Sequence, residues 1–121
     1  MTQSPTDVVT EFCKLWASAT PEQLADHFTE DAVFHNMPMD AVTGREAIKE
    51  FIAAAFAGIE FRVHRQLSDG NRVMNERTDV IHLKDGEEIL LTVMGTFEVV
   101  DGKIAAWRDY FDMATVTSAL A

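Results

Sequence analysis

Val73-Met74-Asn75-Glu76-Arg77-Thr78-Asp79-Val80-Ile81 has the features of a β-strand, with apolar residues at both ends. Turn-forming sequences flank it, Asp69-Gly70-Asn71 before and Asp85-Gly86 after. Because side chains alternate between the faces of a strand, Arg77 and Asp79 share a face with Val73 and Ile81. Burying this ion pair would be costly, and such a cost is usually accepted at a functional site. On spacing alone the pair equally fits a surface ion pair, and Asn75 on the same face weakens the case for burial.

The composition predicts one soluble domain over residues 1–121 that acts on something small. The chain is 47% hydrophobic with eight Phe, enough for a real core, and its net charge is −10. The absence of a basic cluster argues against nucleic acid as a partner. No apolar run is long enough to cross a membrane, and the N-terminal residues lack signal-peptide features, so a cytoplasmic location is expected. The single Cys13 excludes an internal disulfide, and no His pair has metal-site spacing, so no metal is expected.

The first half of the chain predicts three helices. The first opens at Ser4-Pro5, and the second opens with a capping box at Thr20 and runs to about Phe28. A short extended piece follows at residues 32–37. The third helix starts with Thr43 as its cap and runs to Gly58.

From Ile59 onward the pattern predicts antiparallel strands, including 72–83, 88–100 and 103–112. Both faces of the 88–100 segment are apolar, which predicts a central strand covered on both sides, and Gly95 indicates a bend or bulge. Asp101-Gly102 predicts a tight hairpin turn, and residues 113–121 are weakly patterned. The expected fold class is α+β: three N-terminal helices packed on a strongly curved mixed or antiparallel sheet, forming a cone-shaped apolar pocket.

A second carboxylate resembles the first. Asp109 shares a strand face with Trp107 and Phe111, and neighbouring strands can bring it close to Arg77 and Asp79. Two carboxylates in an apolar pocket cannot both ionise cheaply, so their pKa values separate into a general acid and a general base. An arginine between them would hold the geometry and keep the base ionised. This is the equipment for adding water across a strained bond.

Three segments together resemble the limonene-1,2-epoxide hydrolase family, which belongs to the nuclear-transport-factor-2-like (ketosteroid-isomerase-like) superfamily. They are residues 34–38 (FHNMP), 75–80 (NERTDV) and 107–112 (WRDYFD). Their order and approximate separations match the family as well. The resemblance covers nearly the whole chain and implies the same cone-shaped α+β fold.

The resemblance implies a one-step addition of water to a small lipophilic epoxide, giving a vicinal diol, without a metal or organic cofactor. Asp109 matches the general base, Asp79 the general acid, Arg77 the bridge between them, and Asn36 the residue that orients the water. It also implies a homodimer formed through the outer face of the sheet. The expected substrate pocket is lined by apolar and aromatic side chains: Phe34, Trp16, Ile81, Leu91, Val93 and Trp107.

One departure from the family pattern bears on the activity. Phe34 stands where the family usually has a tyrosine that also binds the water, so one hydrogen bond to the nucleophile is missing. Two alternatives therefore stay open beside the hydrolase. One is an isomerase or polyketide-cyclase-like enzyme of the same superfamily, and the other is a non-catalytic dimer that binds a small molecule.

Overall fold

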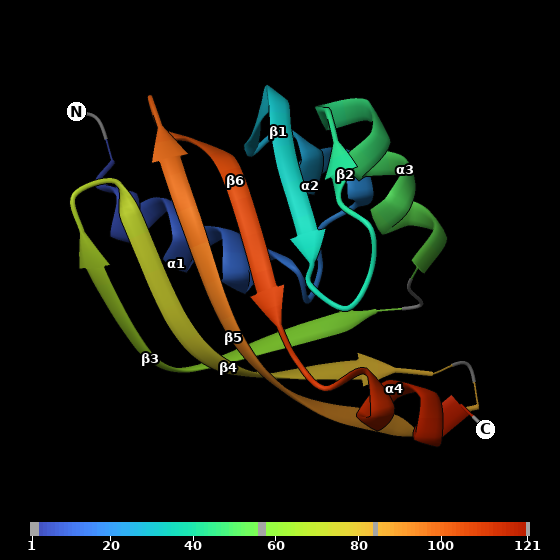
Figure 1. Ribbon diagram of the computed structural model, residues 1–121. Coiled ribbons are helices and arrows are strands. Elements are labelled where there is room, and N and C mark those ends of the chain that lie inside the picture. The colour runs from blue at the N-terminus through green and yellow to red at the C-terminus, as the bar shows by residue number, and fades with distance from the viewer. Residues whose placement is uncertain (1–2, 56–57, 84, 121) are drawn as a thin grey trace.

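A computed structural model describes residues 3–55, 58–83 and 85–120, which form four helices and six strands (Figure 1). The elements follow in the order α1 (Pro5–Leu15), α2 (Pro21–Ala25), β1 (Phe28–Asn36), β2 (Val42–Thr43), α3 (Arg45–Ala55), β3 (Ile59–Asp69), β4 (Arg72–His82), β5 (Glu88–Val100), β6 (Lys103–Tyr110) and α4 (Met113–Leu120).

The strands form one mixed sheet in the order β2-β1-β6-β5-β4-β3. Strands β3 to β6 are an antiparallel meander, whereas β1 runs parallel to β6. Figure 1 shows that the sheet curls strongly without closing and that α1, α2 and α3 lie on its concave side. The predicted α+β fold with a strongly curved sheet is therefore confirmed.

Helix α1 is set by its cap and its apolar stripe. The Ser4 hydroxyl accepts a hydrogen bond from the Asp7 backbone N–H, and Pro5 occupies the first turn. The stripe is buried across the concave side of β3 to β6 and consists of Val8, Val9, Phe12 and Cys13. Phe12 lies at the centre of the aromatic core and meets Trp107 edge to face at 5.2 Å.

The structure corrects two helix boundaries. The capping box at Thr20 is present, but α2 ends at Ala25, and Phe28 already belongs to β1. The extended piece expected at residues 32–37 is the second half of β1, which already begins at Phe28. Residues 29–31 are part of this strand, and its pairing with β6 shifts register there. Helix α3 begins at Arg45, and its first backbone hydrogen bond runs from Ile48 N–H to the Gly44 carbonyl, so the cap position is Gly44. Thr43, the expected cap, lies in β2 and pairs with Val33 of β1. The predicted end of this helix, residues 56–57, lies outside the described residues.

The predicted strands 72–83, 88–100 and 103–112 are present as β4, β5 and β6, although β6 ends at Tyr110, two residues earlier than expected. No bulge lies at Gly95. Pairing runs through Gly95 without a shift on either side, and the irregularity of β5 lies at Glu98/Val99. Strand β5 is central, but its outer face is open within one chain, with Leu90 60% and Met94 49% exposed. Asp101 and Gly102 form the expected turn, both with positive φ (50° and 78°), and the weakly patterned tail forms α4. No helix among the described residues is long and apolar enough to cross a membrane.

Candidate active site

A pocket of about 200 Å³ opens between the concave side of the sheet and the helices. Its walls are almost entirely apolar, and among the described residues, apart from the tryptophans, the only lining side chains with polar groups are Asn36, Asp79 and Asp109. The lining comes from five strands, from α3, α4 and the end of α1, and from the loops that contain Met39 and Phe111. The lining residues are Trp16, Phe34, Asn36, Met39, Phe51, Ile59, Phe61, Asp79, Ile81, Leu91, Val93, Trp107, Asp109, Phe111, Met113 and Val116.

The structure brings all the candidate residues to this one place. Asn36, Asp79 and Asp109 line the pocket, as do the six residues expected to form its apolar wall. Asn36 on β1 pairs directly with Asp109 on β6, so the amide and the carboxyl group lie side by side. Arg77 lies behind the pocket wall and is fully buried.

Arg77 bridges the two carboxyl groups. Its Nε donates to Oδ1 of Asp79 at 2.9 Å, and its Nη2 donates to Oδ2 of Asp79 at 3.0 Å. The same Nη2 donates to Oδ2 of Asp109 at 2.7 Å. Because Asp79 and Asp109 are only 5% and 4% exposed, this is a buried ionic cluster and not a surface ion pair.

Burial and charge act in opposite directions within the cluster. Burial is the largest influence on the pKa of Asp79 and raises it, the hydrogen bonds and charge of Arg77 lower it, and the charge of Asp109 raises it, so that the net pKa is raised. Burial by itself lowers the pKa of Arg77, but the two aspartates outweigh it and the net pKa is raised. Arg77 therefore stays cationic, and the raised pKa of Asp79 favours its protonated form.

Asp109 has a second donor that the sequence does not reveal. The indole Nε1 of Trp107 donates to Oδ1 of Asp109 at 2.6 Å, from two residues earlier on the same face of β6. Trp107 was expected only as a pocket wall. Phe34 stacks on this indole with ring centroids 4.2 Å apart and planes 14° from parallel. The aromatic ring of Phe34 thus supports the side chain that holds the base candidate.

Two more residues contact Arg77 and were missed. Oδ1 of Asn75 accepts from Nη1 of Arg77 at 3.0 Å, and the Phe61 ring lies 4.6 Å below the guanidinium carbon. Asn75 is 2% exposed, so its place on the face of Arg77 and Asp79 was a signal in favour of burial. Phe61 pairs with Asp79 across β3 and β4, a register that the sequence alone does not fix.

Other reactive side chains lie apart from the pocket. Burial raises the pKa of the Cys13 thiol to about 12, so it is not a nucleophile at neutral pH. None of the four histidines lines the pocket. Within the described part of the chain, no three His, Cys, Asp or Glu side chains come together as a metal site.

Comparison with known proteins identifies the family. Residues 3–121 match the model of the limonene-1,2-epoxide hydrolase catalytic domain. This chain belongs to that family. Epoxide hydrolase EphG of Mycobacterium tuberculosis is 34% identical to this member over 86 residues, which are 69% of the chain. The aligned part spans 57% of the length of EphG.

Solved structures share the fold of this limonene-1,2-epoxide hydrolase family member. An LEH-like epoxide hydrolase of M. tuberculosis superposes with a TM-score of 0.84 at 27% identity, covering 96% of this chain and 88% of that one. The epoxide hydrolase/cyclase-like enzyme SalBIII, which has a role in pyran ring formation, superposes with a TM-score of 0.83 and 92% of each chain covered. At 18% identity, the second likeness concerns the fold alone.

Proposed function

We propose that this protein is an epoxide hydrolase that adds water to a small lipophilic epoxide and releases a vicinal diol. The observation that carries the proposal is the buried Arg77, which bonds two carboxyl groups at one side of an apolar pocket. With both aspartates ionised this cluster would carry one excess negative charge. With Asp79 protonated it is neutral, which is the cheaper state in a low-dielectric site and agrees with its raised pKa.

The reaction uses the two carboxyl groups in opposite roles. Asp109 accepts a proton from a water that the Asn36 amide orients, and the water oxygen forms a bond to one epoxide carbon. The bond between that carbon and the epoxide oxygen breaks, and Asp79 donates its proton to the oxygen as negative charge develops there. The products are the diol, protonated Asp109 and ionised Asp79. A proton transfer from Asp109 to Asp79 through solvent restores the resting state.

The pocket favours an apolar substrate with one polar point. Apart from the two carboxyl groups and the amide, its lining is aliphatic and aromatic, with Trp16 and Phe61 stacked at 4.8 Å. A cavity of about 200 Å³ accommodates a small lipophilic epoxide. The names of the relatives, both epoxide hydrolases, support the same reaction class.

The test is a panel of terpene, cycloalkene and styrene-type epoxides scored for diol, with Asp79→Asn and Asp109→Asn beside the wild type. Each substitution removes a proton donor or acceptor in the reaction, so turnover is expected to fall to the uncatalysed level. Circular dichroism and urea unfolding check that the variants remain folded. Diol formation at the wild-type rate in either folded variant would contradict the assigned roles.

Labelled water separates the one-step reaction from a covalent route. In a single turnover in H₂¹⁸O, the label is expected in the diol and not in either aspartate. Label in an aspartate side chain after one turnover would indicate an ester intermediate and overturn the one-step scheme.

Phe34 favours a second candidate function, the binding of a small lipophilic ligand without turnover. It removes the hydroxyl that the family uses to hold the water, while its ring completes the aromatic wall. This candidate predicts ligand binding with no diol across the panel. Proton exchange next to a ketone, with no epoxide turnover, would indicate the isomerase or cyclase alternative instead.

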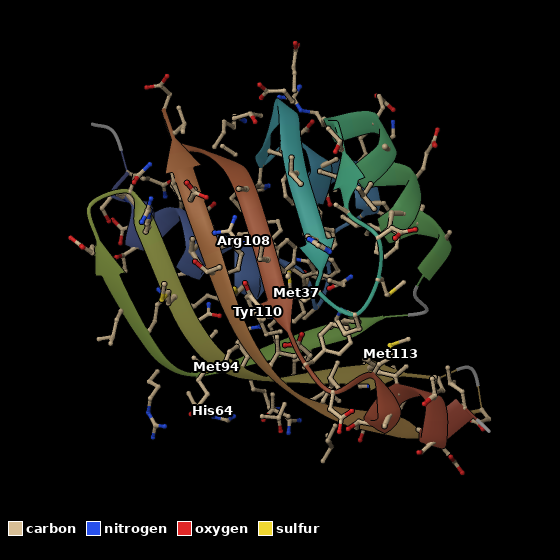
Figure 2. The ribbon with its side chains drawn as sticks, in the orientation of Figure 1. Met37, His64, Met94, Arg108, Tyr110 and Met113 are labelled. Carbon is tan, nitrogen blue, oxygen red and sulfur yellow. The ribbon has the colours of Figure 1, made fainter. Side chains whose placement is uncertain are left out.

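We also propose that two copies pair through the outer face of the sheet. Large apolar side chains are exposed there within one chain, among them Met74, Leu90, Met94 and Tyr110, between 48% and 60%. Figure 2 shows Met94, Tyr110 and Arg108 together on the side of β5 and β6 away from α1. A second copy would cover this apolar surface and make β5 a strand buried on both faces.

A further inference from the structure

Five residues form a single row across five adjacent strands, perpendicular to the chain direction. Gln66 on β3 pairs with Asn75 on β4, and Asn75 pairs with Gly95 on β5. Gly95 pairs with Asp109 on β6, and Asp109 pairs with Asn36 on β1. Four of the five carry polar side chains, and the central position carries none.

The missing side chain leaves the space that Arg77 occupies. A Cβ atom added to Gly95 would lie 2.6 Å from Oδ1 of Asp109 and closer still to Nη1 of Arg77. It would also lie 3.2 Å from Oδ1 of Asn75. Because Gly95 is held by pairing on both sides, its backbone cannot move away, and any larger residue would displace the guanidinium or the carboxylate.

Asn75 accepts a hydrogen bond from the one guanidinium nitrogen of Arg77 that donates to neither aspartate. Nε and Nη2 of Arg77 donate to Asp79 and Asp109, and Nη1 donates to Oδ1 of Asn75 at 3.0 Å. Arginine has no acceptor, so the Asn75 oxygen must point toward it and the Asn75 amide nitrogen must point away.

Gln66 fixes the orientation of the Asn75 side chain and is itself held by helix α1. Its Nδ2 donates to Oε1 of Gln66 at 3.1 Å, and Nε2 of Gln66 donates to Oγ1 of Thr10 at 2.9 Å. Nδ2 of Asn75 also lies 3.8 Å from Sγ of Cys13. A chain of hydrogen bonds thus runs from Thr10 of α1 through Gln66 and Asn75 to Arg77. Neither amide side chain lines the pocket.

We propose that Asn75 is a positioning residue for the reaction: it holds Nη1 of Arg77 so that the guanidinium lies over Gly95 and bonds both aspartates at once. The inference rests on the proposed function, because it concerns the geometry of Asp79 and Asp109. It adds a residue that touches neither substrate nor water and acts through the arginine.

The test compares Asn75→Leu and Asn75→Asp with Val73→Ala. Leucine and aspartate match asparagine in shape, but leucine cannot accept from Nη1 and aspartate adds a third carboxylate beside Arg77. Val73 is fully buried on the same face of β4 and lies outside the pocket, so Val73→Ala controls for lost packing. Losing a hydrogen bond to a charged group corresponds to a fall of about 10- to 100-fold in kcat for Asn75→Leu. KM is expected to stay within about twofold, because Asn75 does not line the pocket.

A second readout needs no turnover. The carboxyl ¹³C signals of Asp79 and Asp109 are followed by NMR against pH in each variant. The charged and titratable groups around them are Arg77 and, from α1, Cys13. In Asn75→Asp the added negative charge is expected to move both aspartate titrations to higher pH, and with them the acid limb of kcat/KM. In Asn75→Leu the released guanidinium alters the titration of both aspartates, whereas Val73→Ala leaves it unchanged.

The two readouts separate this inference from the proposed function. If the wild type turns over no epoxide, the titrations still decide whether Asn75 controls the cluster. Aspartate titrations in both Asn75 variants that match Val73→Ala would overturn the inference, as would a wild-type kcat in Asn75→Leu. Should the leucine variant fail to fold, Asn75→Asp decides alone, and unchanged aspartate titrations in it overturn the inference.

Discussion

Arg77 contributes one positive charge to a cluster whose two carboxyl groups could contribute two negative ones. The structure places this cluster where bulk water screens it little, since all three residues are 5% exposed or less. A single arginine can therefore compensate one ionised aspartate but not two. Burial is the largest cause of the raised pKa of Asp79, and the charge of Asp109 adds to it.

The raised pKa of Asp79 predicts how Asp79→Asn changes stability with pH. For an acid with a raised native pKa, the native state binds the proton more tightly than the unfolded state, so the contribution to stability is fully present below the unfolded pKa of about 3.9. It is lost as pH rises from there through the native pKa, by at most about 1.4 kcal/mol per pH unit. Asparagine does not titrate, so Asp79→Asn should gain stability relative to the wild type as pH rises above about 4.

Urea unfolding of both proteins at intervals between pH 4 and pH 8 measures this difference. The lost bidentate contact with Arg77 adds an offset that is the same at every pH, so the slope and not the offset carries the prediction. A difference that does not change with pH, or that changes in the wild type's favour, would contradict it.

Phe34→Tyr is expected to restore the missing ligand of the nucleophilic water. A neutral hydrogen bond is worth about 0.5–1.5 kcal/mol, which corresponds to a rate gain of about 2- to 10-fold in kcat. The measurement is diol formation across the epoxide panel beside the wild type. Equal or lower activity in a folded Phe34→Tyr protein would indicate that Asn36 and Asp109 hold the water without help.

Among the elements, α4 contributes no side chain to the buried core but lines the pocket. None of its side chains is buried, yet Met113 and Val116 line the cavity. Truncation after Asp112 should therefore leave the urea midpoint nearly unchanged while it raises KM, because two apolar contacts with the substrate are lost. A truncated protein that unfolds at much lower urea, or that keeps the wild-type KM, would show that α4 plays another part.

The sequence predicted the elements that depend on short-range patterns. It did not predict features that depend on which residues pair across neighbouring strands. The Ser4 and Thr20 caps, the Asp101-Gly102 turn and the limits of β4 and β5 follow from short-range patterns, and the structure confirms them. The sequence predicted a bend or bulge at Gly95, but a glycine in a strand can also mark the close approach of another group. Only the register, which sets Arg77 over it, distinguishes a bulge from a gap left for a neighbour.

The same limit applies to the site. The alternation of β4 placed Arg77 and Asp79 on one face, the pattern of β6 singled out Asp109, and the resemblance supplied Asn36. Neither shows that Trp107 donates to Asp109 or that Asn75 accepts from Arg77, since these contacts depend on rotamers packed by distant residues.

At the scale of the whole molecule, the open face of the sheet predicts the assembly. Met94 lies between Glu76 and Tyr110 on the outer face of β5, so Met94→Lys would bring a charge into the proposed contact between two copies. Light scattering after size exclusion should show a dimer for the wild type and a monomer for Met94→Lys. Leu120→Lys, at an exposed apolar residue of α4, is the matched control and should remain dimeric. A wild type that is monomeric at high concentration contradicts the proposed pairing.

The row from Gln66 to Asn36 also has a consequence for how the chain reaches its native state. Its five residues lie on five strands and meet only when four pairings are in register, including the parallel pairing of β1 with β6. A slip of one residue in β4 would turn Arg77 and Asp79 to the opposite face of the sheet. In a chain mispaired in this way Asp109 would be buried without its arginine and Glu76 would turn to the concave face, and the cost of burying unpaired charges would favour reopening of the pairing. The ionic cluster thus disfavours slipped registers of the sheet, because only the correct alignment of the strands buries its charges beside their partners.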